Sequence, residues 1–329
     1  ACPGAKSVLL QLAVNNVTTP LAVPSLSGAQ ERRAVPRIGI IHPSPPPDPW
    51  LDSFQQELHV LGYIPGHNIA IDYRSGRGAV LDELARDLLV SRVDILVTTS
   101  GPAVLAAKRQ TTSVPIVMAM SGDPVGTGVV ANIAHPGENV TGLSLMSADL
   151  AGLRLGMLKE AVPRARRVGV LFDPTEPPTA QELRETEIAA KTLALTLEPL
   201  PASNPDALNQ AIAKAAELHV DALITFAHAF AFVNRAQIIS LSGQHRLPAM
   251  YGWREFAEGG GLMSYGPNVK ATFRRAAVYI DRIIKGARPA DMPIEQPSTF
   301  EFVINQRTAK ALGIEFSPAL LVRADEVIE

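Results

Sequence analysis

The sequence predicts an α/β protein made of two doubly wound lobes, and three observations carry that prediction. Short apolar runs, typical of buried strands, alternate with amphipathic helical patterns from residue 36 onward. The alternation restarts near residue 167, which indicates two similar lobes in tandem. The chain has 329 residues, of which 47% are hydrophobic and only 19% charged, so it can bury two cores.

The first lobe follows a β-α-β-α-β-α-β order. Its strands are predicted over the apolar or alternating runs 37–41, 68–73, 94–98 and 115–119. Its helices are predicted where apolar residues recur at helical spacing, over 50–62, 81–89 and 102–110. This order is typical of a parallel sheet covered by helices on both faces.

The second lobe repeats the pattern, with strands predicted at 167–172, 196–200, 221–225 and 248–251 and helices at 179–193, 206–219 and 231–244. Short extended links are expected at 139–145 and 261–266, followed by a helix at 269–285, a strand at 300–304 and a helix at 308–312. We therefore expect two Rossmann-like lobes joined by a multi-strand hinge. The first comprises 35–142 plus about 267–299, and the second comprises 143–266 plus about 300–329.

Residues 1–34 are predicted to lie outside the fold. Lys6 precedes the short apolar run 8–14, and Ser27-Gly28-Ala29 is a small-x-small pattern of the kind signal peptidase accepts. This order suits the remnant of an export signal, and the alternative is a disordered tail with chance small residues. Cys2 would, on the first interpretation, be a candidate for lipid attachment and a membrane anchor.

Composition and missing motifs exclude several functions. The net charge of −2 leaves no basic excess for nucleic acid, and a single cysteine excludes a disulfide framework or thiolate metal cage. The sequence has no Gly-x-Ser-x-Gly, no Walker loop and no Gly-x-Gly-x-x-Gly at a first turn. Its seven histidines show no metal-ligand spacing. We therefore predict no catalytic residue, no cofactor and no metal.

Candidate ligand-binding residues lie where strands end and helices begin, because ligands of open parallel sheets bind at that edge. Ser100, after Thr98-Thr99, could present a hydroxyl and free backbone N–H groups to an anionic group, or could simply cap its helix. Asp123 could accept an ammonium group or cap the turn that follows it. His228 follows another strand and could face a ligand or be a structural residue.

The chain has only two tryptophans, and each follows a predicted strand end. We expect Trp50 and Trp253 on the rim between the lobes, where aromatic faces could clamp a planar ligand or a cation. The alternative is that each covers the core of its own lobe.

From about Arg37 to Glu329 the chain resembles the ABC-type transporter substrate-binding family whose better-known members bind tryptophan or other aromatic amino acids. The segments that carry the resemblance are spread along the chain. They are Leu61-Gly62-Tyr63, Asn68-Ile69, Asp72-Tyr73, Pro115-Ile116-Val117, Gly122-Asp123-Pro124-Val125, Pro136-Gly137-Glu138-Asn139-Val140-Thr141-Gly142, Ser264-Tyr265-Gly266, Lys285-Gly286, Pro289-Ala290-Asp291, Ile304-Asn305, Lys310-Ala311-Leu312-Gly313 and Ala324-Asp325-Glu326-Val327-Ile328.

The resemblance implies a type I periplasmic-binding fold with the ligand in the cleft between the lobes. Its ligand-facing turns correspond here to Ser44, Trp50, Thr99, Ser100, Asp123, Glu176, Thr179, His228, Tyr251 and Trp253. In this interpretation the hydroxyls after the third strand hold an anionic group, an acidic side chain (Asp123 or Glu176) holds an amine, and an aromatic ring stacks on the organic body of the ligand.

The resemblance further implies an exported or periplasmic receptor, a monomer with no nucleic-acid partner, which delivers a small organic ligand to an ABC permease in the membrane. An aromatic amino acid or another carboxylate is the expected ligand. The rival hypothesis is a ligand-sensing module for signalling or transcription control, since the same architecture serves such domains. An enzyme with an unrecognised site is the third and least favoured interpretation.

Overall fold

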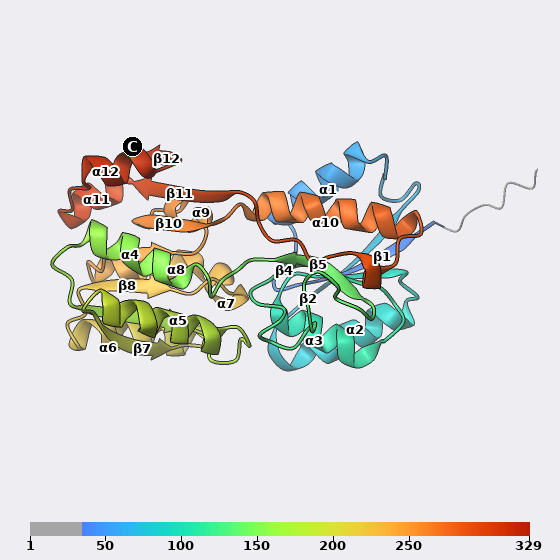
Figure 1. Cartoon of the computed structure of the whole chain (residues 1–329), viewed down its shortest axis with the longest axis horizontal. Helices are drawn as coiled ribbons and strands as arrows, with labels where there is room; N and C mark the ends of the chain where they lie inside the picture. Colours follow the sequence, from blue (N-terminus) through green and yellow to red (C-terminus); the bar gives the residue numbers. More distant parts are fainter. Residues whose placement is uncertain (1–34) are drawn as a thin grey trace, which may run out of the picture. The chain divides into compact units, whose positions relative to one another are not determined.

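Two β-sheets, each flanked by helices, organise residues 35–329, the part of the chain that the computed structural model describes (Figure 1). The export signal and the lipidation of Cys2 predicted above lie outside these residues. Within the described part, none of the helices combines the length and the apolar character that crossing a membrane requires.

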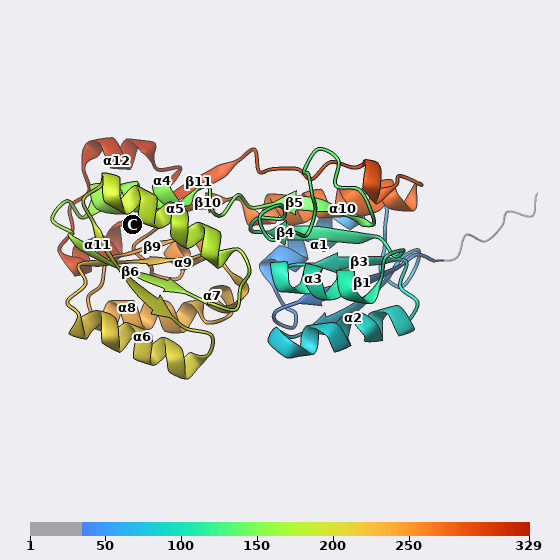
Figure 2. The same cartoon turned by 60° about the horizontal axis from the view of Figure 1, so that its bottom comes forward.

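The first lobe is a five-stranded parallel sheet in the order β2-β1-β3-β4-β5. Its strands are β1 (Arg37–His42), β2 (Ala70–Ser75), β3 (Ile95–Thr98), β4 (Ile116–Ser121) and β5 (Val140–Ser144). Helices α1 (Pro49–Val60) and α10 (Val269–Ile284) pack together on one face, and α2 (Leu81–Val90) and α3 (Gly101–Gln110) on the other (Figure 2). The short 3-10 helices are η1 (Gly78–Val80) and η2 (Pro289–Asp291).

The second lobe is a seven-stranded sheet in the order β12-β11-β10-β9-β8-β6-β7. Its strands are β6 (Arg167–Phe172), β7 (Thr196–Pro201), β8 (Ala222–Thr225), β9 (Ala249–Tyr251), β10 (Met263–Pro267), β11 (Phe300–Asn305) and β12 (Glu326–Ile328). Its helices are α4 (Ala151–Ala161), α5 (Thr179–Thr192), α6 (Pro205–Glu217), α7 (Ala229–Val233), α8 (Arg235–Gln244), α9 (Arg254–Glu258), α11 (Gln306–Leu312) and α12 (Pro318–Arg323). The sheet is mixed, because β11 runs antiparallel to β10.

Three sequence-based expectations differ from the structure. The segments 139–145 and 261–266, expected as links, contain the sheet strands β5 and β10, because their backbones pair with β4 and β9. The helix expected over 231–244 is broken at Asn234, which ends α7 and begins α8. Asn234 Nδ2 donates to the Phe230 carbonyl at 2.9 Å, and such a local bond competes with the helical backbone pattern.

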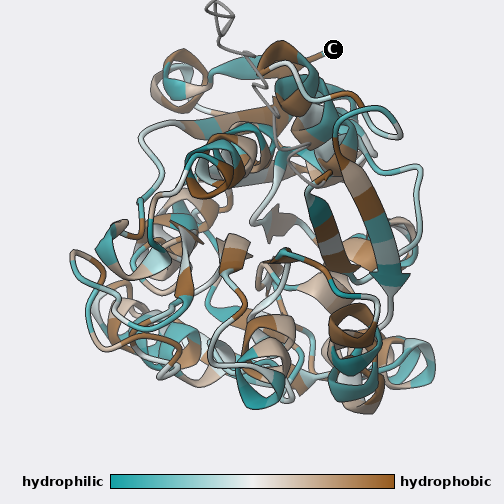
Figure 3. Cartoon of the chain, turned by 90° about the vertical axis from the view of Figure 1, so that its right-hand side faces the viewer, coloured by the Kyte–Doolittle hydropathy of each residue, from teal (hydrophilic) through white to brown (hydrophobic). Residues whose placement is uncertain are grey.

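The chain passes between the two lobes three times within residues 35–329: from β5 to α4, from β10 to α10, and from η2 to β11. Beside the first crossing, Ser144 N donates to the Glu295 carbonyl at 2.9 Å and Glu295 N donates to the Gly142 carbonyl at 2.9 Å. Helices on the outside carry both apolar and polar residues along their length, as Figure 3 shows, and their apolar faces cover the sheets. The carboxyl ends of β3 and β6, inner strands of the two sheets, face the same space between the lobes, because residues in the turns that follow them line one cavity.

Candidate ligand-binding site

A cavity of about 420 Å³ lies between the lobes at the carboxyl ends of their strands. This volume falls within the roughly 300–1,000 Å³ of typical small-molecule sites. Its apolar lining includes Leu81, Pro102 and Leu105 from the first lobe. A second cavity of about 20 Å³ adjoins it, and both cavities are lined by Ser100, Glu176 and Ala229.

The first lobe gives the cavity a wall that suits an anion. Ser100 is the N-cap of α3, and its Oγ accepts from the Ala103 N–H at 3.4 Å. The second residue of this ten-residue helix is Pro102, which has no N–H, so the Gly101 N–H and the Ser100 hydroxyl are the donors left at the helix start, where the helix dipole favours a carboxylate. Arg77 follows β2, and its guanidinium lies 5.1 Å from the centre of the Phe230 ring of the second lobe. Arg109 also lines the cavity, with its charge paired to Asp82 at 2.7 Å.

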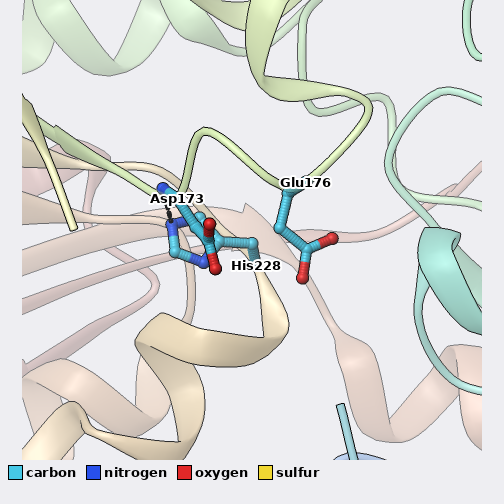
Figure 4. Close-up of side chains that lie close together, drawn as sticks. All are labelled: Asp173, Glu176 and His228. Carbon is cyan, nitrogen blue, oxygen red and sulfur yellow. Dashed lines mark hydrogen bonds between the residues drawn. The ribbon is translucent and has the colours of Figure 1, made fainter. Parts of the chain in front are cut away.

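The second lobe gives the cavity an acidic wall (Figure 4). Asp173 and Glu176 come from the loop between β6 and α5, and His228 is the N-cap of α7. Asp173 is 4% exposed, and its Oδ1 accepts from both the backbone N–H and the hydroxyl of Thr175, at 2.9 and 2.7 Å. The two acidic side chains and the imidazole each place one atom within 4.8 Å of the other two.

Burial shifts the pKa of Glu176 and that of His228 in opposite directions. Burial first, and the Asp173 carboxylate second, raise the pKa of the Glu176 carboxyl to about 7, while Arg77 acts in the opposite direction. Burial also lowers the pKa of the His228 imidazole to about 4, so this ring is neutral at neutral pH. A bound cation would relieve the repulsion between the two carboxylates and favour the ionised form of Glu176.

The three groups do not fit a metal ion well, although their separation would allow one. The Asp173 N–H lies 3.1 Å from His228 Nε2, and the Ala231 N–H lies 3.2 Å from Nδ1. A neutral imidazole has one acceptor nitrogen, so only one of these contacts can be a hydrogen bond, and both nitrogens face backbone amides. The two carboxylates therefore remain as the groups suited to a cation, and an ammonium, which brings its own donors, suits them better than a metal ion.

Beside the smaller cavity, a buried ion pair joins two helices of the second lobe. Arg154 of α4 donates to Glu182 of α5 at 3.0 Å and to the Tyr265 carbonyl at 2.8 Å, with both charged side chains at most 4% exposed. Glu182 also lines the smaller cavity. Burial raises the pKa of the Glu182 carboxyl, and the Arg154 guanidinium opposes that rise. This pair anchors the start of α5, next to the loop that carries Asp173 and Glu176.

Four of the ten residues proposed from the sequence line one of the two adjoining cavities: Ser100, Glu176, Thr179 and His228. The hydroxyl of Thr179 donates to the Asp173 carbonyl at 3.0 Å and so helps to shape the acidic loop.

Four others face elsewhere. The Thr99 hydroxyl is buried and donates to the Ile41 carbonyl at 3.2 Å, and the Ser44 backbone N–H donates to His42 Nδ1 at 3.3 Å.

Asp123 and Tyr251 also lie outside the two cavities. Asp123 Oδ1 accepts from the Gly126 N–H at 2.8 Å, so Asp123 caps the turn that follows it, and it borders a separate cavity of about 610 Å³. Tyr251 is 1% exposed and stacks on Phe256, with ring centres 4.6 Å apart, inside the second lobe.

The expectation that the tryptophans lie on the rim is wrong. Trp50 and Trp253 are each 1% exposed, and neither lines the cavity. Neither simply covers its own lobe, because Trp50 of α1 stacks on Phe232 of the second lobe with ring centres 3.7 Å apart. The ring of Trp253 meets that of Trp50 edge-on at 5.2 Å. Aromatic residues of the two lobes therefore pack directly against each other.

Sequence reasoning missed Arg77, Asp173, and the pair Arg154 and Glu182 as site residues. Arg77 and Asp173 had a usable signal, since each follows a strand that ends at the edge where ligands bind. Arg154 and Glu182 lie inside helices, where a charge normally faces solvent, and nothing in the local pattern distinguished them.

Three chain crossings connect two doubly wound lobes, and a polar cavity lies between these lobes. This arrangement defines the class of the molecule as a two-lobed solute-binding protein. A family model described as ABC transporter substrate binding protein matches residues 40–328, and the chain belongs to that family. The family consists of solute-binding proteins and not of enzymes.

Individual proteins are similar to this chain in sequence or in fold. The chain is 24% identical over 265 residues to the tyrosine-binding protein of Clostridioides difficile (strain R20291), covering 80% of this chain and 76% of that protein. A Streptococcus pneumoniae ABC domain solved in complex with L-Trp has a TM-score of 0.83 at 24% identity, covering 89% of this chain and 99% of that one.

The ligand-free, open structure of a Clostridium difficile substrate binding protein with adhesive properties has a TM-score of 0.64 at 22% identity, covering 90% of this chain and 99% of that one. The fold is therefore the type I periplasmic-binding fold that the sequence resemblance implied.

Proposed function

We propose that this protein is an exported receptor that captures a small zwitterionic ligand, an α-amino acid, between its lobes and delivers it to an ABC permease in the membrane. One observation carries the choice of ligand: the lobes present opposite charges to one cavity. Arg77 and the start of α3 at Ser100 line it from one lobe, and Asp173 and Glu176 line it from the other. A carboxylate on the first wall and an ammonium on the second would bridge the lobes.

The proposed mechanism is hinge closure around the bound ligand. A ligand that contacts both walls gains interactions in the closed state that the open state lacks, so it shifts the equilibrium towards closure. Tyrosine and tryptophan, which the relatives bind, are the first candidates, because Leu81, Pro102 and Leu105 offer apolar surface beside the charged walls.

A thermal-shift screen of aromatic and aliphatic amino acids, aromatic carboxylic acids without an amine, sugars and small amines tests this proposal. A ligand present at one hundred times its Kd adds about 2.7 kcal/mol of stability, enough to raise the Tm by several degrees. We expect stabilisation by amino acids. Stabilisation only by carboxylic acids would contradict the ammonium role of the acidic wall, and silence across the panel would contradict the proposed ligand class.

We expect Ser100→Ala to weaken binding of the amino acid that the screen identifies by about fivefold, or about 1 kcal/mol, because one hydrogen-bond donor to the carboxylate is lost. The variant also loses a helix cap, so Asn204→Ala is the matched control. Asn204 caps α6 by accepting from the Ala207 N–H at 2.9 Å, and it does not line the cavity. Isothermal titration should show unchanged affinity in the control, and unchanged affinity in Ser100→Ala would remove Ser100 from the site.

We also expect ligand affinity to rise with pH between about 6 and 8. The raised pKa of Glu176, about 7, means that its carboxyl becomes neutral as the pH falls through 7 and then attracts an ammonium less. The loss is at most about tenfold per pH unit for one titrating group. Three groups face Glu176, namely Asp173, His228 and Arg77. The pKa of His228 is about 4, so its imidazole stays neutral between pH 6 and 8. Titrations at three pH values should show the slope vanish in Glu176→Gln, and an equal slope in that variant would contradict the assignment.

A further inference from the structure

We propose that Trp50 is a positioning residue that holds the lobes together before the ligand arrives, and so sets how tightly the ligand binds. The inference rests on the hinge closure of the proposed function. It concerns a group of residues that lines neither of the two adjoining cavities: Trp50 from the first lobe, with Phe232, Trp253 and Glu255 from the second.

The contacts of Trp50 cross the interface in three ways. Its ring lies 3.7 Å from that of Phe232 at an angle of 24°, its ring meets Trp253 edge-on, and its Nε1 donates to Glu255 Oε1 at 2.6 Å. The three aromatic side chains are at most 2% exposed. Such stacked and edge-on pairs contribute beyond the apolar area that they bury. These contacts involve protein groups only, so they stabilise the observed contact between the lobes without a ligand, and we take this contact as part of the closed state.

Neighbouring residues hold both Trp50 and Phe232 in position. Asp48 caps α1 by accepting from the Trp50 and Leu51 N–H groups at 2.9 and 3.2 Å, which fixes the start of the helix that carries the indole. On the other side, the Arg235 guanidinium lies 4.5 Å from the centre of the Phe232 ring and donates to the Phe232 carbonyl at 3.0 Å.

Two buried polar atoms in the contact between the lobes oppose its formation. Trp253 Nε1 and Glu255 Oε2 are buried with no hydrogen-bond partner among the described residues. Opening would return these atoms to water, so burying them without partners opposes closure. Stacking therefore favours the contact between the lobes, and the desolvation of these two atoms opposes it.

The fraction of ligand-free protein that is closed determines the apparent affinity for the ligand. The apparent Kd equals the intrinsic Kd of the closed state divided by the fraction of ligand-free protein that is already closed. A variant that lowers this fraction tenfold therefore raises the apparent Kd tenfold, although it touches neither wall of the cavity.

The two tryptophans supply the experiment, because the chain contains no others and both belong to this contact. We would measure acrylamide quenching of tryptophan fluorescence and the radius of gyration by small-angle X-ray scattering, both on the ligand-free full chain. The wild type should show shielded tryptophans and a small radius. Phe232→Leu, which keeps both fluorophores and removes the stacking ring, should increase quenching and enlarge the radius.

Phe226→Leu is the matched control, because Phe226 is 1% exposed and packs on Phe172 within the second lobe. It should reduce stability and leave quenching and radius unchanged. Gly122→Ala is a second route if Phe232→Leu does not fold. A Cβ at position 122 would lie 2.9 Å from the Pro178 ring of the other lobe, so this change should hinder closure and expose the tryptophans.

Freely quenched tryptophans and a large radius in the ligand-free wild type, matching Phe232→Leu, would overturn the inference. This failure is distinct from failure of the proposed function. An open ligand-free protein that still binds an amino acid contradicts only the role of Trp50, and a closed one that binds no amino acid contradicts only the ligand proposal.

Discussion

Glu182→Ala is expected to lower the free energy of unfolding by about 3–5 kcal/mol, because it leaves the buried Arg154 guanidinium without its anionic partner. Arg154 is 1% exposed and, besides Glu182 at 3.0 Å, donates to the Tyr265 carbonyl. Burial lowers the pKa of Arg154, and the charge of Glu182 opposes that effect, so Glu182 favours the charged form of the guanidinium. Urea unfolding monitored by circular dichroism measures the loss.

Two controls make the cause identifiable. Asp82→Ala breaks the pair between Arg109 and Asp82, whose side chains are 57% and 37% exposed, and should cost less than about 1 kcal/mol. Replacing both buried partners together, as Arg154→Met with Glu182→Leu, should recover much of the stability, since no uncompensated charge remains. A loss of under 1 kcal/mol in Glu182→Ala, or a double variant as unstable as the single one, would contradict this account.

Gly142→Ala is expected to lower the free energy of unfolding by about 2–4 kcal/mol, from backbone strain and steric conflict together. Gly142 lies in β5 with a φ of 135°, in the region that favours glycine. A Cβ there would lie 2.2 Å from the Met118 carbonyl oxygen of the paired strand β4, so the strands would have to separate. The same urea titration measures this loss.

Gly128→Ala separates the two causes. Gly128 has a φ of 71° with nothing within 4 Å of an added Cβ, so only strain of about 1–2 kcal/mol should appear. Equal losses at both positions would show that the contact with Met118 contributes nothing.

Most of the secondary structure could be predicted from the sequence, because helical and strand periodicities are local properties. The helix predicted at 269–285 is α10 (Val269–Ile284), and the strand predicted at 167–172 is β6 (Arg167–Phe172). The errors have a common cause. The segment around Val140–Ser144 looked like a link because it stands alone in the sequence, and it becomes a strand only because β4 offers an edge to pair with.

The site was only partly predictable, for a similar reason. Ser100 and Glu176 could be proposed because they lie at strand-to-helix turns, where ligands of parallel sheets bind. The partners that complete the cavity come from other parts of the chain, and no local pattern relates Arg77 to Asp173.

The sequence by itself determined the α/β class, the two tandem lobes and the family, since these depend on periodicity, repetition and motifs along the chain. The tertiary structure alone decided which charges face one cavity, that Arg154 and Glu182 are buried together, and that Trp50 packs across the interface instead of lying on its rim. The physical reason is that burial, pairing and pKa depend on distances between side chains that only folding brings together, here over separations of up to 205 residues between Trp50 and Glu255.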